Sequence, residues 1–160
     1  MLTQDSKSIA GLEDTEATHN PEELPEWMEI KSWPGGFVKS MRFFANSERR
    51  NGKGLVWMTN STDMVEGEPT IDMVRLLGMV DLANGIVPRT GLDVSQLEWA
   101  FPNIDLQIHM YRIPVGNWLG IEAIQQNGED GIGLTSAILH DTKGPFGRSE
   151  QILTLRRLTP

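Results

Sequence analysis

The chain has 160 residues, no cysteine and a formal net charge of −8. This length fits one domain, and the acidic balance argues against nucleic acid as the main partner, because phosphate binding needs a basic face. Without cysteine the chain has no disulfide, no thiolate metal ligand and no cysteine nucleophile. No apolar run reaches the roughly 20 residues that span a bilayer. The first residues lack a signal-peptide pattern, so we expect a cytoplasmic protein without a membrane partner.

The first 26 residues are predicted to form a flexible leader or linker. They contain few large apolar side chains, so they cannot bury enough surface to become ordered. Their acidic residues are Asp5, Glu13, Asp14, Glu16, Glu22, Glu23 and Glu26. Residues 27–160 are predicted to form a single domain.

Six stretches of that domain are predicted to be strands. Residues 37–45 and 53–62 form a hairpin, and residues 103–113 alternate apolar and polar side chains, as in a half-buried antiparallel strand. Turn residues separate the last three strands, at 118–126, 132–141 and 147–157.

One long helix is predicted between the second and third strands, from Pro69 to Asn84. Proline suits the first turn of a helix, and Asn84-Gly85 is a typical stop. Apolar residues occupy nearly every face, which is typical of a buried helix. The economical fold is therefore α+β, with a curved antiparallel sheet wrapped around this helix.

Asp81 interrupts the apolar pattern of the helix and is the first candidate for a functional residue. Burial and a helix C-terminus both disfavour a charged carboxylate, and a broken local rule often marks a functional position. The simpler alternative is a hydrogen-bond acceptor for the following loop, or an exposed helix-end carboxylate. Gln151 shares the inward face of its strand, although it could serve only a hydrogen bond across the sheet. Asn103 opens a strand after Pro102, although it could be a simple turn residue.

Other catalytic signatures are absent from the sequence. It has no GxSxG elbow, P-loop, HExxH motif or GxGxxG in a βαβ unit. Its three histidines, His19, His109 and His140, lack metal-ligand spacing, and the last two are expected on strand surfaces. We therefore expect no metal ion and no cofactor. A basic set could bind phosphate or simply form a solvated edge: Arg148, Arg156 and Arg157.

Several stretches of residues 25–158 occur in the order and spacing of a known family. They are Gly54-Leu55-Val56-Trp57 with Val65-Glu66-Gly67-Glu68-Pro69, Val80-Asp81-Leu82-Ala83-Asn84-Gly85, Asn103-Ile104-Asp105-Leu106 through His109-Met110-Tyr111-Arg112 to Trp118, and Gly133-Leu134 to Gln151. This pattern resembles the C-terminal half of the double-hotdog acyl-CoA thioesterases of the thioesterase II type.

The resemblance implies a hotdog fold and hydrolysis of a fatty acyl-CoA thioester by water. It implies an active site formed by an aspartate at the helix end, a residue opening the next strand and a glutamine of the last strand. These positions fall on Asp81, Asn103 and Gln151. Family members can have threonine where this chain has Asn103.

The family's usual protein contains two hotdog halves, whereas this chain resembles one half. We therefore expect a homodimer or a separate second hotdog half. The alternative function is a non-catalytic acyl-binding or structural half-subunit. A hotdog hydratase or dehydratase is disfavoured, because those enzymes generally use a histidine with a carboxylate on the central helix, and residues 69–84 contain no histidine.

Overall fold

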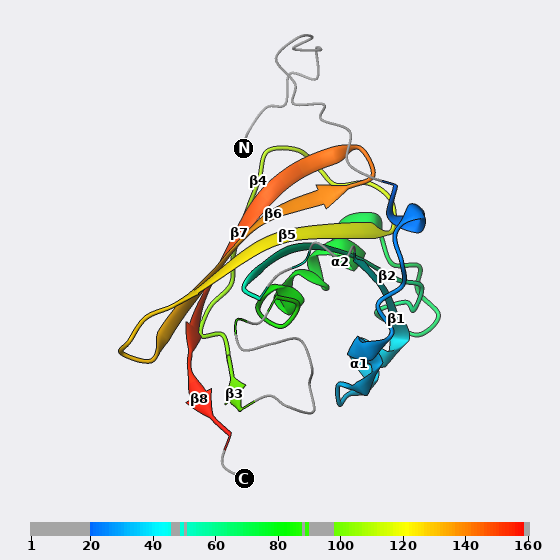
Figure 1. The fold of residues 1–160 in the computed structure, drawn as a ribbon. Coiled ribbons are helices and arrows are strands. Elements are labelled where there is room, and N and C mark those ends of the chain that lie inside the picture. The colour runs from blue at the N-terminus through cyan, green and yellow to red at the C-terminus, as the bar shows by residue number, and fades with distance from the viewer. Residues whose placement is uncertain (1–19, 46–48, 50, 88, 90–97, 159–160) are drawn as a thin grey trace.

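The computed structural model describes residues 20–45, 49, 51–87, 89 and 98–158. Six strands form one antiparallel sheet in the order β1-β2-β5-β6-β7-β4 (Figure 1). Their bounds are β1 Met41–Ala45, β2 Lys53–Asn60, β4 Gln107–Met110, β5 Trp118–Asn127, β6 Ile132–Asp141 and β7 Gly144–Thr154. A second, two-stranded sheet pairs β3 Trp99–Ala100 with β8 Arg156–Arg157.

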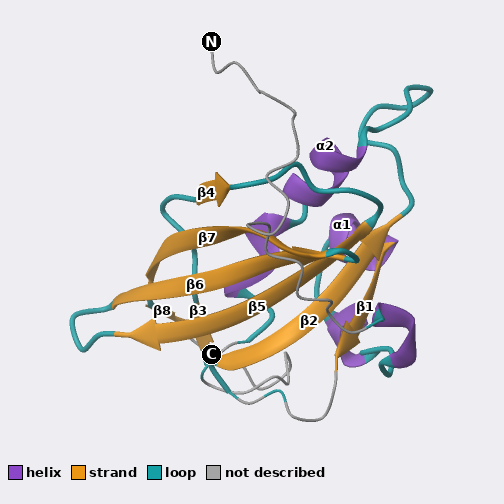
Figure 2. Cartoon of the chain, turned by 90° about the horizontal axis from the view of Figure 1, so that it is seen from above, coloured by secondary structure: helices purple, strands orange, loops and turns teal. Residues whose placement is uncertain are grey.

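The large sheet arches over the helical segment of residues 72–84 (Figures 1 and 2). The α-helices are α1 Gly36–Ser40 and α2 Asp72–Leu77, and the 3-10 helices are η1 Pro21–Glu23, η2 Glu29–Ser32 and η3 Val80–Asn84. All six predicted strands occur in the predicted order. The first is shorter than predicted, because α1 occupies residues 36–40, and the third, predicted over residues 103–113, spans only Gln107–Met110.

The prediction of one continuous helix over residues 69–84 is wrong. Ile71, the residue before α2, has an extended backbone, and α2 ends at Leu77. Glycine is a poor helix former, and a Cβ on Gly78 would lie 2.9 Å from the Met64 side chain. Beyond Gly78 the backbone hydrogen bonds join residues three apart, as in a 3-10 helix. The Met79 N–H donates to the Leu76 carbonyl at 3.1 Å, and η3 follows.

The prediction that this segment is buried on all sides is also wrong. Leu76, Met79 and Val80 are buried beneath the sheet. Ile71 and Val74 are 63% and 41% exposed on the other side of the segment. The sheet therefore covers one side of α2 and η3 and leaves apolar residues on the opposite side uncovered.

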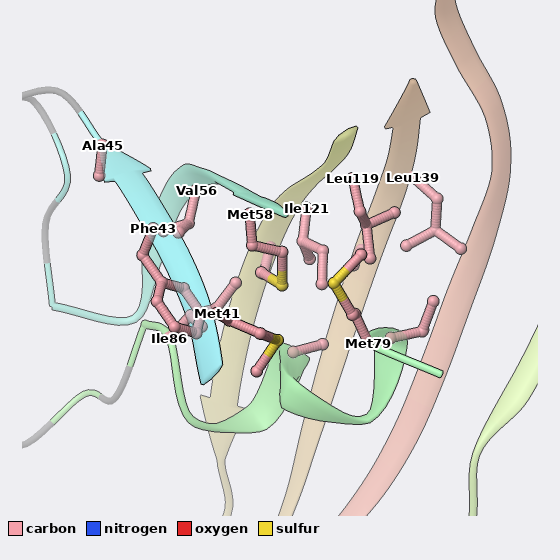
Figure 3. Packing of buried hydrophobic residues seen from close by; sticks show 14 of the residues in the cluster. Met41, Phe43, Ala45, Val56, Met58, Met79, Ile86, Leu119, Ile121 and Leu139 are labelled. Carbon is pink, nitrogen blue, oxygen red and sulfur yellow. The ribbon is translucent and has the colours of Figure 1, made fainter. Parts of the chain in front are cut away.

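The core lies between the concave face of the sheet and the helical segments (Figure 3). Alternation along β1 turns Met41 and Phe43 into the core and leaves Arg42 exposed. Met79 and Ile86 are buried in the same cluster from the helical side. Apolar contacts thus hold the buried side of the helical segment against the concave face of the sheet. These contacts set the distance between η3 and the strands.

Part of the predicted leader packs along the outer edge of β1. The Pro25 carbonyl accepts a hydrogen bond from the Ala45 N–H at 3.1 Å, and the Trp27 N–H donates to the Phe43 carbonyl at 2.8 Å. Residues 20–26, assigned to the leader by the sequence, thus belong in part to the sheet region. Residues 1–19 lie outside the described part, and the division after residue 26 stays a prediction.

An ion pair with a fully buried carboxylate and a partly exposed guanidinium joins the loop before β5 to the β6–β7 hairpin. Both carboxylate oxygens of Asp141 accept from the Arg112 guanidinium, at 2.6 and 2.7 Å. Burial alone raises the pKa of the Asp141 carboxyl, but hydrogen bonds from Arg112 and from the Val115 and Lys143 N–H groups outweigh it. The pKa of Asp141 therefore lies below its ordinary value.

We expect Asp141→Asn to lower the free energy of unfolding by about 3 kcal/mol, because Arg112 loses its charged partner. Urea unfolding measures the loss. Asp63→Asn, which breaks the more exposed pair with Arg75, is the matched control and should cost much less. Because the pKa of Asp141 is lower folded than unfolded, its contribution is present above about pH 4 and is lost at lower pH. Equal losses in the two variants would contradict this account.

Candidate functional site

The three predicted site residues converge on one carboxylate oxygen. The Asn103 Nδ2 group donates to Asp81 Oδ1 at 2.6 Å. Gln151 Nε2 lies 3.4 Å from the same oxygen and 3.3 Å from the Asp81 backbone carbonyl. Asp81 lies on η3, Asn103 follows β3, and Gln151 lies on β7. Segments far apart in the sequence therefore meet at Asp81.

The backbone around Asn103 is attached on both sides. Asn84, at the end of η3, donates through Nδ2 to the Phe101 carbonyl at 2.8 Å. On the other side, the Ile104 N–H donates to the Ile152 carbonyl of β7 at 2.8 Å. Asn103 is thereby held between η3 and β7, which explains how its short side chain reaches Asp81. The turn-residue alternative does not account for this bond.

Gln151 is fully buried on the concave face of β7. The two groups it contacts on η3, the Asp81 carbonyl and Asp81 Oδ1, are both acceptors, so the amide NH₂ must face them. The hydrogen bond of Gln151 thus runs to η3 and not across the sheet. This orientation leaves the amide oxygen directed away from Asp81.

Gln125 on β5 also holds η3 against the sheet, and the sequence analysis did not identify it. Its Nε2 group donates to the Asn84 carbonyl at 3.0 Å, and its Oε1 accepts from the Arg89 N–H at 3.1 Å. It is fully buried and follows the inward positions Ile121 and Ala123 with the period of a strand. That period could have identified Gln125, because an amide on an inward face needs buried partners.

The predicted environment of Asp81 is wrong in two respects. Its side chain is exposed, and it lies in the first turn of η3 instead of the last turn of a long α-helix. Within the described part of the chain, hydrogen bonds reach only Oδ1 of the carboxylate. Oδ2 accepts no hydrogen bond from the described residues, so it is available to a water molecule or a ligand. The arrangement is an oriented carboxylate with one occupied and one available oxygen.

Other candidates lie away from this site. His140 is buried, not at the strand surface as expected, and burial lowers its pKa despite Glu122, whose Oε2 lies 3.4 Å from Nε2. His109 is exposed on β4, and His19 lies outside the described residues. The basic residues Arg148, Arg156 and Arg157 are exposed. Among the described residues, no three His, Asp or Glu side chains are placed to hold a metal ion.

A family model of the acyl-CoA thioesterase C-terminal domain matches residues 19–155. The chain belongs to this family. The match includes Asp81, Asn103 and Gln151 and nearly all of the described residues. A search of curated proteins finds no match. In the described residues, no helix is long and apolar enough to cross a membrane.

Solved structures share the fold at low sequence identity. A protein with a hot dog fold from Alicyclobacillus acidocaldarius has a TM-score of 0.64 and 13% identity, over 92% of this chain and 58% of that one. An acyl-CoA thioesterase II from Mycobacterium marinum has a TM-score of 0.57 and 13% identity, over 95% and 59%. The predicted α+β hotdog fold is confirmed. This thioesterase-family chain spans somewhat more than half the length of these proteins.

We expect the Asn103–Asp81 hydrogen bond to appear as a coupling energy of about 1 kcal/mol in a double-mutant cycle of Asn103→Ala and Asp81→Ala. Urea unfolding of the two single variants and the double variant gives the value. The control cycle pairs Asp81→Ala with Thr59→Ala on β2, where we expect no coupling. A coupling near zero for Asn103 would show that the bond does not form in solution.

Proposed function

We propose that this thioesterase-family chain hydrolyses fatty acyl-CoA thioesters by direct attack of water, with Asp81 as general base. The observation that carries the proposal is the convergence of Asn103 and Gln151 on one oxygen of the Asp81 carboxylate. Two amides that donate to Oδ1 fix the plane of the carboxylate and leave Oδ2 for a water. A base held in one orientation is what general base catalysis requires.

In the proposed step, a water held by Asp81 Oδ2 attacks the thioester carbonyl carbon, and its proton passes to the carboxylate. The tetrahedral oxyanion then collapses, and the bond from carbon to sulfur breaks with its electron pair on sulfur. The proton returns from Asp81 to the products, which are a free fatty acid and the CoA thiol. A thiolate leaves easily, so no strong general acid and no covalent nucleophile are needed.

Asn103 and Gln151 have different places in this proposal. Asn103 makes the shorter bond, and its second Nδ2 proton can also bind the attacking water or the substrate carbonyl. Gln151 is buried and holds both the backbone and the side chain of Asp81. A threonine in place of Asn103, as the family allows, offers a hydroxyl that can bind the same water. The asparagine is therefore compatible with the proposed chemistry.

A second hotdog half, either another copy or a separate chain, is part of the proposal. Apolar residues are uncovered on the open side of the helical segment and next to β4, namely Ile71, Val74, Met110, Tyr111 and Ile113. Among the described residues, β4 pairs only with β7, so its outer edge is open. The opposite edge of the sheet, at β1, is covered by the residues around Trp27. An unpaired edge beside an apolar surface favours association. A partner there would also shield the exposed Asp81 from bulk water.

The exposure of Asp81 also favours the second candidate function, a half-subunit that binds acyl groups or supports another chain. Such a half would lack turnover alone and gain no activity from assembly. The cytoplasmic location and the role in lipid metabolism stay predictions.

We expect Asp81→Asn to lower the rate of thioester hydrolysis by about 100- to 10,000-fold, because asparagine cannot accept the water's proton. Free-thiol release from short to long acyl-CoAs measures the rate, and urea unfolding checks that the fold is retained. Glu129→Gln, in the exposed β5–β6 turn, is the matched control. An unchanged rate in Asp81→Asn would remove this residue from the mechanism.

We expect the purified chain to form a dimer through the uncovered apolar surface, and Val74→Glu to weaken it because the charge must be desolvated there. Light scattering coupled to size-exclusion chromatography gives the mass of the wild-type chain and of Val74→Glu. Ile132→Glu, at a somewhat more exposed apolar residue on the β5–β6 end of the sheet, is the control. A wild-type monomer would favour a separate partner chain, and a dimer unaffected by Val74→Glu would place the interface elsewhere.

A further inference from the structure

Three buried polar atoms next to the candidate site have no hydrogen-bond partner among the described residues. They are Thr135 Oγ1, Ser149 Oγ and Gln151 Oε1. Thr135 and Ser149 are each 1% exposed and Gln151 is fully buried. A buried polar group without a partner costs free energy, so three in one place need an explanation.

The register of β6 and β7 places the three side chains together. Thr135 lies directly opposite Gln151, and Ser149 precedes Gln151 by two residues on the same face. Opposite residues of an antiparallel pair have Cβ atoms about 5 Å apart. The residue opposite Ser149 is Ala137, which has a small apolar side chain and offers Ser149 Oγ no hydrogen-bond partner.

The orientation of the Gln151 amide determines which hydrogen-bonding group its oxygen needs. Its NH₂ group faces two acceptors of Asp81, so Oε1 points away from η3 and needs a donor. Thr135 and Ser149 each carry one hydroxyl proton and can also accept. None of the three atoms is in direct hydrogen-bond contact with another, and a group that both donates and accepts could satisfy all three.

We propose that one buried water molecule binds Thr135 Oγ1, Ser149 Oγ and Gln151 Oε1, and that the two hydroxyl residues position the Gln151 amide for catalysis. Three partners are the usual number for a buried water. The water donates to Oε1 and so fixes which end of the amide faces Asp81. The catalytic part of this inference rests on the proposed thioesterase function, whereas the water site itself does not.

The bridging water therefore opposes rotation of the Gln151 amide group by half a turn. Rotation would place Oε1 against the carbonyl and Oδ1 of Asp81, where acceptors repel each other, and would leave Asn103 as the remaining donor to the carboxylate. Without the bridge, the amide loses the bond that opposes this rotation. Thr135 and Ser149 make no hydrogen bond to Asp81 and would act through Gln151, so they are positioning residues.

The test compares Thr135→Val with Thr135→Ser in the full chain in its assembled state. Valine keeps the shape of threonine and removes the hydroxyl, whereas serine keeps the hydroxyl. We expect Thr135→Val to lower kcat about tenfold, the worth of one such hydrogen bond, with KM unchanged, and Thr135→Ser to recover most of the rate. Thr59→Val on β2 is the matched control and should leave both constants unchanged.

The side-chain NH₂ signals of Gln151 in a ¹⁵N NMR spectrum provide a second readout that does not need activity. Loss of these signals in Gln151→Leu identifies them. We expect Thr135→Val and the smaller change Ser149→Ala to shift or broaden them, and Thr135→Ser to restore them. Unchanged signals in both variants would overturn the water site. Shifted signals in a chain that hydrolyses no acyl-CoA would support the water site and contradict the proposed function.

Discussion

The attachment of η3 to the sheet determines where the residues of the candidate site lie. Two glutamine amides make this attachment, Gln125 to the Asn84 carbonyl at 3.0 Å and Gln151 to the Asp81 carbonyl at 3.3 Å. A 3-10 helix of five residues has few hydrogen bonds of its own, and its backbone carbonyls need donors. Gln125 on β5 and Gln151 on β7 supply these donors, and Thr135 on β6 lies between the two glutamines. The donors that order η3 thus also place the Asp81 carboxylate beside Asn103.

The sequence was informative wherever one local pattern decided the structure. Alternation located the strands, and β6 was predicted with its bounds at Ile132 and Asp141. The family resemblance grouped Asp81, Asn103 and Gln151, and the structure brings them together. The break at Gly78 was missed, because a glycine inside an apolar helical pattern is often tolerated. Its close packing against Met64 depends on a loop that no local pattern reveals.

Asp81 is exposed, and so are apolar residues of the helical segment that precedes it. The sequence showed an apolar residue on nearly every face of the segment, from which complete burial followed. In this chain one sheet covers one side only, so Leu76 is buried while Val74 is exposed. The apolar pattern is therefore explained if a second hotdog half covers the other side. Burial of the site then becomes a property of the assembly and not of the single chain.

Transfer of oxygen from labelled water tests the central claim, direct water attack on an acyl-CoA, most directly. In a single turnover of acyl-CoA in H₂¹⁸O, the account predicts one solvent oxygen in the released fatty acid. It also predicts no label in the Asp81 carboxylate, as read by mass spectrometry of the peptide that contains it. An unlabelled first product with label in Asp81 would show that the carboxylate attacks as a nucleophile. No released acid in any acyl-CoA reaction of the assembled protein would contradict hydrolysis itself.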